Sequence, residues 1–160
     1  MEIEKKFLVK DISHLNLSNY SKIEMVQDYL YIDKLTIVRK RKCIKNNQKT
    51  YMYTIKTDKK NLSVNEIEKE ITEDEYNSLP TKPSYNSLSK TRYIIPYIED
   101  LKIELDIFHG IYDGLIFAEI EFNSEEQANS IPVPKWFDKE LSNTMTNSDM
   151  ALRKIDMEEF

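Results

Sequence analysis

The stretch MEIEKKFLVK, residues 1–10, alternates in the way that is typical of a β-strand. With a period of two, Glu2, Glu4 and Lys6 share one face, and Ile3 lies on the other. Two acids and a base therefore line one side of the first predicted strand. Such a face either meets solvent or lines a polar interior, and the later strands have to decide between these two interpretations.

Further segments resemble strands because they alternate or because they are rich in Ile, Val, Tyr, Thr and Phe. Together with the first, they cover residues 1–9, 24–32, 35–44, 50–57, 65–72, 88–96, 101–108 and 115–122. Capping patterns predict short helices after Thr72 and Ser124, and Ser148 is expected to open a last helix that runs through Ile155. This pattern favours an α+β fold, mainly antiparallel β, in one domain that spans residues 1–160.

Charged residues two positions apart recur on nearly every predicted strand, and their sign is segregated by strand. The acids are Glu66/Glu68/Glu70, Glu104/Asp106 and Glu119/Glu121, and the bases are Arg39/Arg41, Lys56 and Lys90/Arg92. A sheet with one wet face would also alternate between apolar and charged residues. However, the pairs are almost purely charged, and the grouping of signs would suit a pocket that holds cations at one wall and an anion at the other.

Eight strands can close into a barrel whose lumen holds one ligand. If the charged face points inward, carboxylates, arginines and lysines fill that lumen, and they would be poorly solvated without a ligand. Hard divalent cations such as Mg²⁺ or Mn²⁺ bind carboxylate oxygens, and phosphate oxygens bind guanidinium and ammonium groups. A metal-bound polyphosphate therefore matches both signs.

The composition excludes several other classes of protein. The chain has 160 residues, 32% of them charged, and a formal net charge of -5, which argues against a protein that coats nucleic acid. Its two glycines form no phosphate-binding loop, and its two histidines and single cysteine form no zinc motif. No segment resembles a membrane span or a secretory signal, so we expect a cytoplasmic protein that contacts neither membrane nor nucleic acid.

The N-terminal Glu2-x-Glu4-x-Lys6 resembles the ExExK signature of the CYTH superfamily, the triphosphate tunnel metalloenzymes. Seven further stretches match the family in order along the chain. They are QDYL at 27–30, VRKRK at 38–42, TIK at 54–56, EIEKEI at 66–71, KTRY at 90–93, ELDIF at 104–108 and FAEIEF at 117–122. The resemblance covers residues 1–155 and implies an eight-stranded antiparallel barrel that closes into a tunnel, with short helices packed outside.

The resemblance also implies roles for individual residues. It makes Glu2, Glu4, Glu119 and Glu121 metal ligands, which Asp106 joins, for Mg²⁺ or Mn²⁺. It assigns the triphosphate cradle to Lys6, Arg39, Arg41, Lys56, Lys90 and Arg92. The residues expected to carry catalysis are Glu4, Lys6, Arg39, Arg41 and Glu119. Supporting residues around the site are Glu66, Glu68, Glu70 and Tyr29.

The activity that the resemblance implies is metal-dependent hydrolysis of a small-molecule triphosphate, with inorganic tripolyphosphate as the leading substrate and a water that attacks the terminal phosphorus in line. Thiamine triphosphatase and class IV-type adenylate cyclase activities are the enzymatic alternatives, and a module that only binds polyphosphate or nucleotide is the non-enzymatic one. The expected state is a monomer or a homodimer. The segment KELSNTMTNSDMAL, residues 139–152, departs from the family's pattern, which leaves the role of Lys139 open.

Overall fold

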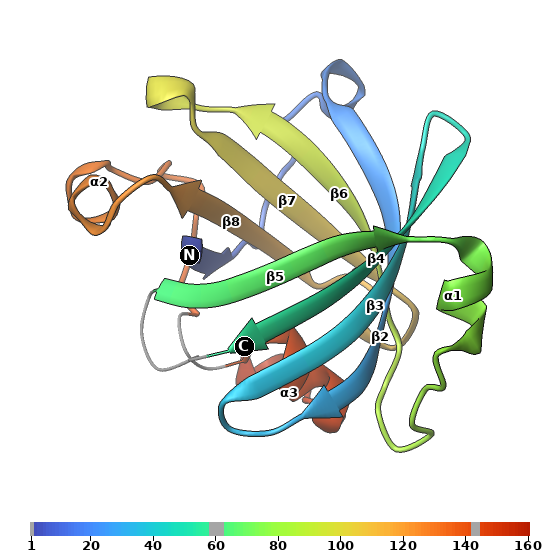
Figure 1. Ribbon diagram of the computed structural model, residues 1–160. Coiled ribbons are helices and arrows are strands. Elements are labelled where there is room, and N and C mark those ends of the chain that lie inside the picture. Colours follow the sequence, from blue (N-terminus) through green and yellow to red (C-terminus); the bar gives the residue numbers. More distant parts are fainter. Residues whose placement is uncertain (1, 58–62, 142–144) are drawn as a thin grey trace.

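The computed structural model describes residues 2–57, 63–141 and 145–160 (Figure 1). Within them, eight strands form one antiparallel sheet in the spatial order β1-β5-β4-β3-β2-β6-β7-β8, which confirms the predicted number of strands and their antiparallel arrangement. The strands are β1 (Glu2–Leu8), β2 (Ser21–Ile32), β3 (Thr36–Lys45), β4 (Gln48–Thr57), β5 (Ser63–Ile71), β6 (Leu88–Pro96), β7 (Lys102–His109) and β8 (Ile116–Phe122). The helices are α1 (Glu73–Ser78), α2 (Glu125–Ser130) and α3 (Asn147–Leu152), with single 3₁₀ turns η1 (Leu17–Asn19), η2 (Ile98–Asp100), η3 (Gly110–Tyr112) and η4 (Met157–Glu159).

The hairpin turns follow from local sequence. Asn46 and Asn47, between β3 and β4, both adopt left-handed backbone conformations, with φ of 51° and 64°. Asparagine tolerates this region better than most residues, and two such residues in succession match the twist of a tight hairpin. Asp33 fixes the turn between β2 and β3, because its Oδ1 accepts hydrogen bonds from the backbone N–H groups of Leu35 and Thr36.

The sheet curls round on itself, but the wall between β1 and β5 is narrow. Within the described residues, β1 pairs with β8 over six residue pairs and with β5 over two, Glu2↔Val64 and Ile3↔Ser63. Farther along β1, the backbone of residues 138–141 forms hydrogen bonds with the edge of this strand. The Leu141 N–H donates to the Lys6 carbonyl and the Leu8 N–H donates to the Lys139 carbonyl, both at 2.8 Å.

The predicted barrel was a tunnel closed by strands along its full height. This prediction needs correction. The physical reason is that backbone donors and acceptors on a strand edge pair with the nearest chain, and from Lys6 onward that chain is the C-terminal segment rather than β5. Lys139, whose role was open from the sequence, contributes through its backbone carbonyl to this added edge. Figure 1 shows β5 and β8 on either side of the N-terminus.

Apolar side chains of the charged strands point outward and form the larger core. Ile3 and Phe7 of β1 are buried with Leu105 of β7 and Ile120 of β8, and Ala128 of α2 packs on the same cluster. The outward parity expected for Ile3 is thus confirmed, and it leaves the opposite face of the same strands, with its charges, turned inward.

A second core closes one end of the curled sheet. Met150 of α3 and Ile155 after it pack with Phe108, Tyr112 and Phe117, all of which are almost completely buried. The last helix was expected to run through Ile155, but α3 ends at Leu152. The phenol of Tyr112 explains this end, because it donates to the carbonyls of Met150 and Arg153 and accepts the Ile155 N–H at 3.0 Å.

Among the described residues, no helix is long and apolar enough to cross a bilayer.

Candidate functional site: a pocket with a cationic and a carboxylate wall

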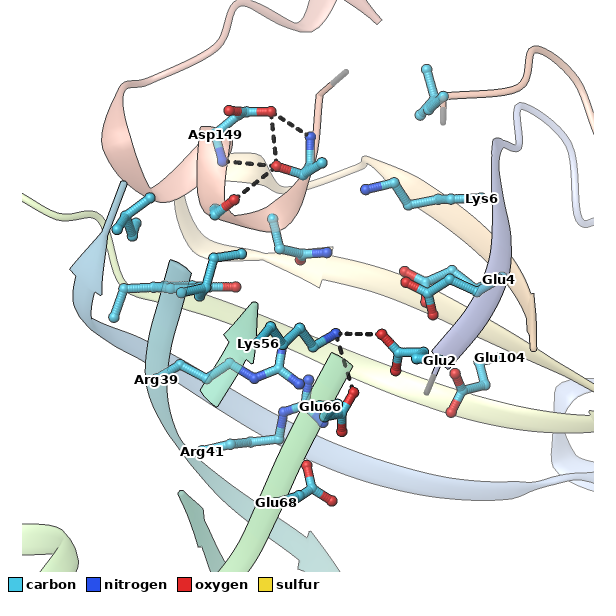
Figure 2. A pocket seen from close by; sticks show the side chains of 18 of the residues that line it. Glu2, Glu4, Lys6, Arg39, Arg41, Lys56, Glu66, Glu68, Glu104 and Asp149 are labelled. Atoms are coloured by element: carbon cyan, nitrogen blue, oxygen red, sulfur yellow. Dashed lines mark hydrogen bonds and ion pairs between the residues drawn. The ribbon is translucent and has the colours of Figure 1, made fainter. Parts of the chain in front are cut away.

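A pocket of about 580 Å³ lies inside the curled sheet, and most of the residues that line it are charged. Figure 2 shows Arg39 and Arg41 projecting from β3 on one side and Glu2 and Glu4 from β1 on the other, with Lys56 between them. Of the predicted site residues, the structure brings Glu2, Glu4, Lys6, Arg39, Arg41, Lys56, Lys90, Arg92, Glu119, Glu121, Glu66, Glu68 and Tyr29 to this pocket. The walls differ in sign, as the segregation of charge by strand predicted.

Three arginines form the centre of the cationic wall. Arg39, Arg41 and Arg92 are all buried, yet the Nε atoms of Arg39 and Arg41 have no hydrogen-bond partner. Burial, followed by the charges of Arg39 and Arg92, lowers the pKa of Arg41 to about 10. Buried donors without partners are rare in folded proteins, and mutual repulsion makes this cluster a favourable place for an anion.

Arg41 is held in place by an amide. Its Nη2 donates to Oε1 of Gln27 at 2.6 Å, and Nε2 of Gln27 donates to the Tyr29 hydroxyl at 3.2 Å. Gln27 is fully buried, and it belongs to the QDYL stretch of β2 without having been assigned a role from the sequence. The signal in the sequence was parity, because Gln27 lies two positions before Tyr29 on the same face of the strand; the structure adds that it is the register partner of Arg41.

Lys90 and Arg92 of β6 converge on Asp106 of β7. The Lys90 Nζ lies 2.7 Å from Oδ2, and Arg92 donates from Nε to Oδ1 at 2.7 Å and from Nη2 to Oδ2 at 2.9 Å. Burial alone would raise the pKa of Asp106, but Arg92 and Lys90 outweigh it and hold this pKa well below its usual range. Asp106 lies behind the pocket wall instead of on the surface of the pocket.

The carboxylate wall is formed by β1 and β8. Glu4 and Glu119 have no hydrogen-bond or ion-pair partner among the residues that the structure describes. Burial, followed by the negative charges of Glu119 and Glu2, raises the pKa of Glu4 well above its ordinary value. Arg92 and the lysines around the pair act on it only from beyond ion-pair distance, so a cation that binds between or beside the two carboxylates would stabilise them further.

Lys56 links the two walls. Its Nζ lies 2.9 Å from Oε1 of Glu2 and 3.6 Å from Oε2 of Glu66. Burial, followed by a hydrogen bond with Glu66, raises the pKa of Glu2 to about 6. Burial and Arg39 disfavour the charge on Lys56, but Glu4, Glu2 and Glu66 outweigh them and raise its pKa.

Lys6 connects β1 to the C-terminal segment. Its ammonium lies 4.9 Å from the centre of the Phe117 ring and donates to the Met145 carbonyl at 3.2 Å. Burial lowers the pKa of this lysine. The residues Thr146 to Asp149 line the pocket beside it, and Asp149 caps α3 together with Thr146. The resemblance implied that this segment lies near a tunnel mouth, but no residue from Thr146 to Asp149 was assigned a role from the sequence.

Two placements differ from the predicted set of supporting residues. Glu70 shares the parity of Glu66 and Glu68 but is exposed and does not line the pocket. Glu104, which the sequence analysis left without a role, lines the pocket and lies 3.0 Å from Nη1 of Arg92. Its parity with Asp106 on β7 was the signal that could have identified it.

The carboxylates suit a divalent cation in their chemistry, although the described residues contain no group of three or more His, Cys, Asp or Glu side chains with the geometry of a complete metal site. Mg²⁺ is usually held by one or two carboxylates, water and substrate phosphates rather than by a full protein cage. The unpaired carboxylates of Glu4 and Glu119 fit that mode of binding.

Known proteins resemble this chain over nearly its whole length. No family model matches the sequence. The inorganic triphosphatase of Acetivibrio thermocellus is 33% identical over 145 residues, which cover 88% of this chain and 85% of that protein. The inorganic triphosphatase of Nitrosomonas europaea is 28% identical over 151 residues, which cover 94% and 95%. A solved structure described as the inorganic triphosphatase NE1496 superposes with a TM-score of 0.63 at 28% identity and covers 96% of this chain and 95% of its own. The sequence relatives, the shared fold and the two-signed pocket agree, and this chain belongs to the inorganic triphosphatases of the CYTH superfamily, the triphosphate tunnel metalloenzymes.

Proposed function

We propose that this protein hydrolyses inorganic tripolyphosphate to orthophosphate and pyrophosphate, and that the reaction needs Mg²⁺ or Mn²⁺. The observation that carries the proposal is the pairing of two unmatched walls in one pocket. The buried Nε–H groups of Arg39 and Arg41 have no acceptor, and among the described residues the carboxylates of Glu4 and Glu119 have no cation at ion-pair distance. A polyphosphate with a bound divalent metal supplies both. The relatives, both inorganic triphosphatases, support the same substrate class.

In this proposal the cationic wall binds and orients the phosphate chain. Arg39, Arg41 and Arg92 donate charge-assisted hydrogen bonds to oxygens of the phosphoryl groups, and Lys6, Lys56 and Lys90 add ammonium contacts. Because these groups are fixed by the sheet and partly desolvated, their attraction for developing negative charge is stronger than in water. Their main effect is to hold the terminal phosphorus in a single orientation for in-line attack.

The carboxylate wall would hold the metal through Glu4 and Glu119, with Glu2 and Glu121 nearby. When bound, the metal would neutralise charge on phosphate oxygens and make a water more acidic. The attacking water oxygen forms a bond to the terminal phosphorus while the bond from that phosphorus to the bridging oxygen breaks. A carboxylate of the same wall receives the proton that the water loses, and the bridging oxygen leaves with the pyrophosphate.

The test is product identification with three substrates: tripolyphosphate, thiamine triphosphate and ATP, each with Mg²⁺ or Mn²⁺ and with a chelator as control. Orthophosphate and pyrophosphate from tripolyphosphate, with slower turnover of the other two, support the proposal. Cyclic AMP with pyrophosphate from ATP would instead assign a cyclase. Binding of tripolyphosphate without turnover under any of these conditions would make the protein a binding module. The variant Arg153→Gln, which changes an exposed arginine that does not line the pocket, serves as the matched control.

A further inference from the structure

We propose that Asp106 is a positioning residue for the cationic wall rather than a metal ligand. Its side chain has no exposed surface, and it lies behind the pocket lining formed by Lys90 and Arg92. The inference rests on the proposed function only in taking a polyphosphate as the anion that the wall binds. It departs from the role that the resemblance implies for Asp106.

The geometry already uses both oxygens of Asp106. Oδ1 accepts from the Arg92 Nε, and Oδ2 accepts from both the Arg92 Nη2 and the Lys90 Nζ, at 2.7–2.9 Å. The fork of Arg92 is therefore bound from behind in the bidentate manner that fixes a guanidinium in its plane. A metal at Asp106 would have to displace at least one of these charge-assisted contacts.

The same contacts offset the repulsion between the positive charges of the cationic wall. Arg41 and Arg92 repel each other across the pocket wall, and Lys90 adds a third positive charge close by. A buried anion behind Lys90 and Arg92 lets these cations converge without a ligand. Glu104 assists from the pocket side, at 3.0 Å from the Arg92 Nη1, but it is more exposed than Asp106.

Carboxylates suited to metal differ in kind from Asp106. Within the described part of the chain, Glu4 and Glu119 have no cation at ion-pair distance, and both line the pocket. Asp106 has two cations and does not line it. The structure thus divides the acids of the barrel interior into a set that faces the ligand and one residue that supports the opposite wall.

The experiment measures tripolyphosphate affinity by calorimetry on the full chain in the presence of a chelator, so that no metal contributes. Asp106→Asn removes a negative charge, which by simple electrostatics should strengthen binding of an anion. If Asp106 positions Arg92 and Lys90, binding weakens instead, by about tenfold or more, the scale of one lost charge-assisted contact. Asp138→Asn is the matched control, because it also removes one carboxylate, but at a surface position outside the pocket lining, and it should leave metal-free affinity unchanged.

Asp106→Glu is a second variant, which keeps the inference testable if Asp106→Asn does not fold. It keeps the charge and moves the carboxylate by one methylene, so positioning predicts weaker metal-free binding with unchanged Mn²⁺ affinity. Unchanged or stronger metal-free binding of tripolyphosphate in a folded Asp106 variant, or a loss of Mn²⁺ affinity equal to that of Glu119→Gln, would overturn the inference. A wild-type protein that binds tripolyphosphate but does not hydrolyse it would refute the proposed function alone, because this assay requires no turnover.

Discussion

Replacing Arg41 with methionine should stabilise the ligand-free protein while it removes most of the activity. Arg41 is buried in the cationic wall beside Arg39 and Arg92, and its Nε has no partner. Such a side chain destabilises the ligand-free protein. We expect it to stabilise the protein only when an anion is bound in the pocket. Methionine retains the aliphatic part of the side chain and removes the charge.

The magnitude follows from the pKa of Arg41, which burial and then Arg39 and Arg92 lower from 12.5 to about 10. At about 1.36 kcal/mol per unit, the charged form is disfavoured in the folded protein by about 3 kcal/mol. Because the folded-state pKa is the lower one, this destabilisation is present at every pH below about 10 and is lost only as the pH rises above it. The variant also leaves Oε1 of Gln27 without its donor, at a cost of about 1–2 kcal/mol.

The net expectation is a gain of about 1–2 kcal/mol in the free energy of unfolding, or about 4 °C in Tm for a domain of this size. In the same Arg41→Met variant, kcat/KM for tripolyphosphate should fall by about 10²-fold, which is typical for loss of a preorganised electrostatic contact. Urea unfolding and phosphate release measure the two effects. Arg153→Met, on the surface, should change neither by much. A variant that is less stable than the wild type, or one with unchanged kcat/KM, would refute the reasoning about Arg41.

Three further outcomes can be checked with the same preparations. Glu119→Gln should lower metal-dependent phosphate release by about 10²-fold, because one of the two unpaired carboxylates is lost. The Mn²⁺ concentration needed for half-maximal rate should also rise. If the variant and the wild type depend equally on Mn²⁺, Glu119 is not part of the metal site. In a chelator, the free energy of unfolding should fall as the pH rises from 4.5 to about 6, since the folded protein retains a proton on Glu2 that the unfolded chain releases. Glu2→Gln should flatten that slope, and a slope unchanged in the variant would contradict the assignment. Addition of Mg²⁺ together with tripolyphosphate should raise Tm by more than the sum of the two separate additions, as measured by differential scanning fluorimetry, and simple additivity would argue against a shared site.

Strand parity predicted the wall residues well because a strand fixes which face a side chain occupies. Glu2, Glu4 and Lys6 face the pocket, and Ile3 faces the outer core, as the period of two requires. Parity does not predict how far along a strand the pocket extends. Glu70 has the correct face but opposes Met52 near the end of β5, beyond the pocket, so it is exposed.

Other features depended on contacts between distant parts of the chain. The pairing of the segment 138–141 with β1, and the hydrogen bond from Lys6 to the Met145 carbonyl, join residues more than a hundred positions apart. No local pattern in either segment encodes such a contact. Asp106 shows the same limit, because the family resemblance implied a metal ligand there, and only the positions of Lys90 and Arg92 across the sheet reveal its two ion pairs.

The unmatched charges of the two walls imply that the two ligands reinforce each other. The phosphate chain alone would satisfy Arg39 and Arg41 but would bring more negative charge toward Glu4 and Glu119, which already repel each other. The metal alone would satisfy those carboxylates and increase the positive charge facing the arginines. Each ligand therefore lowers the electrostatic cost of the other, and by linkage the effect is reciprocal. On the proposed function, a pocket of this kind would select the metal complex of the polyphosphate over either component, and this selection would account for the charges of both signs in one small sheet.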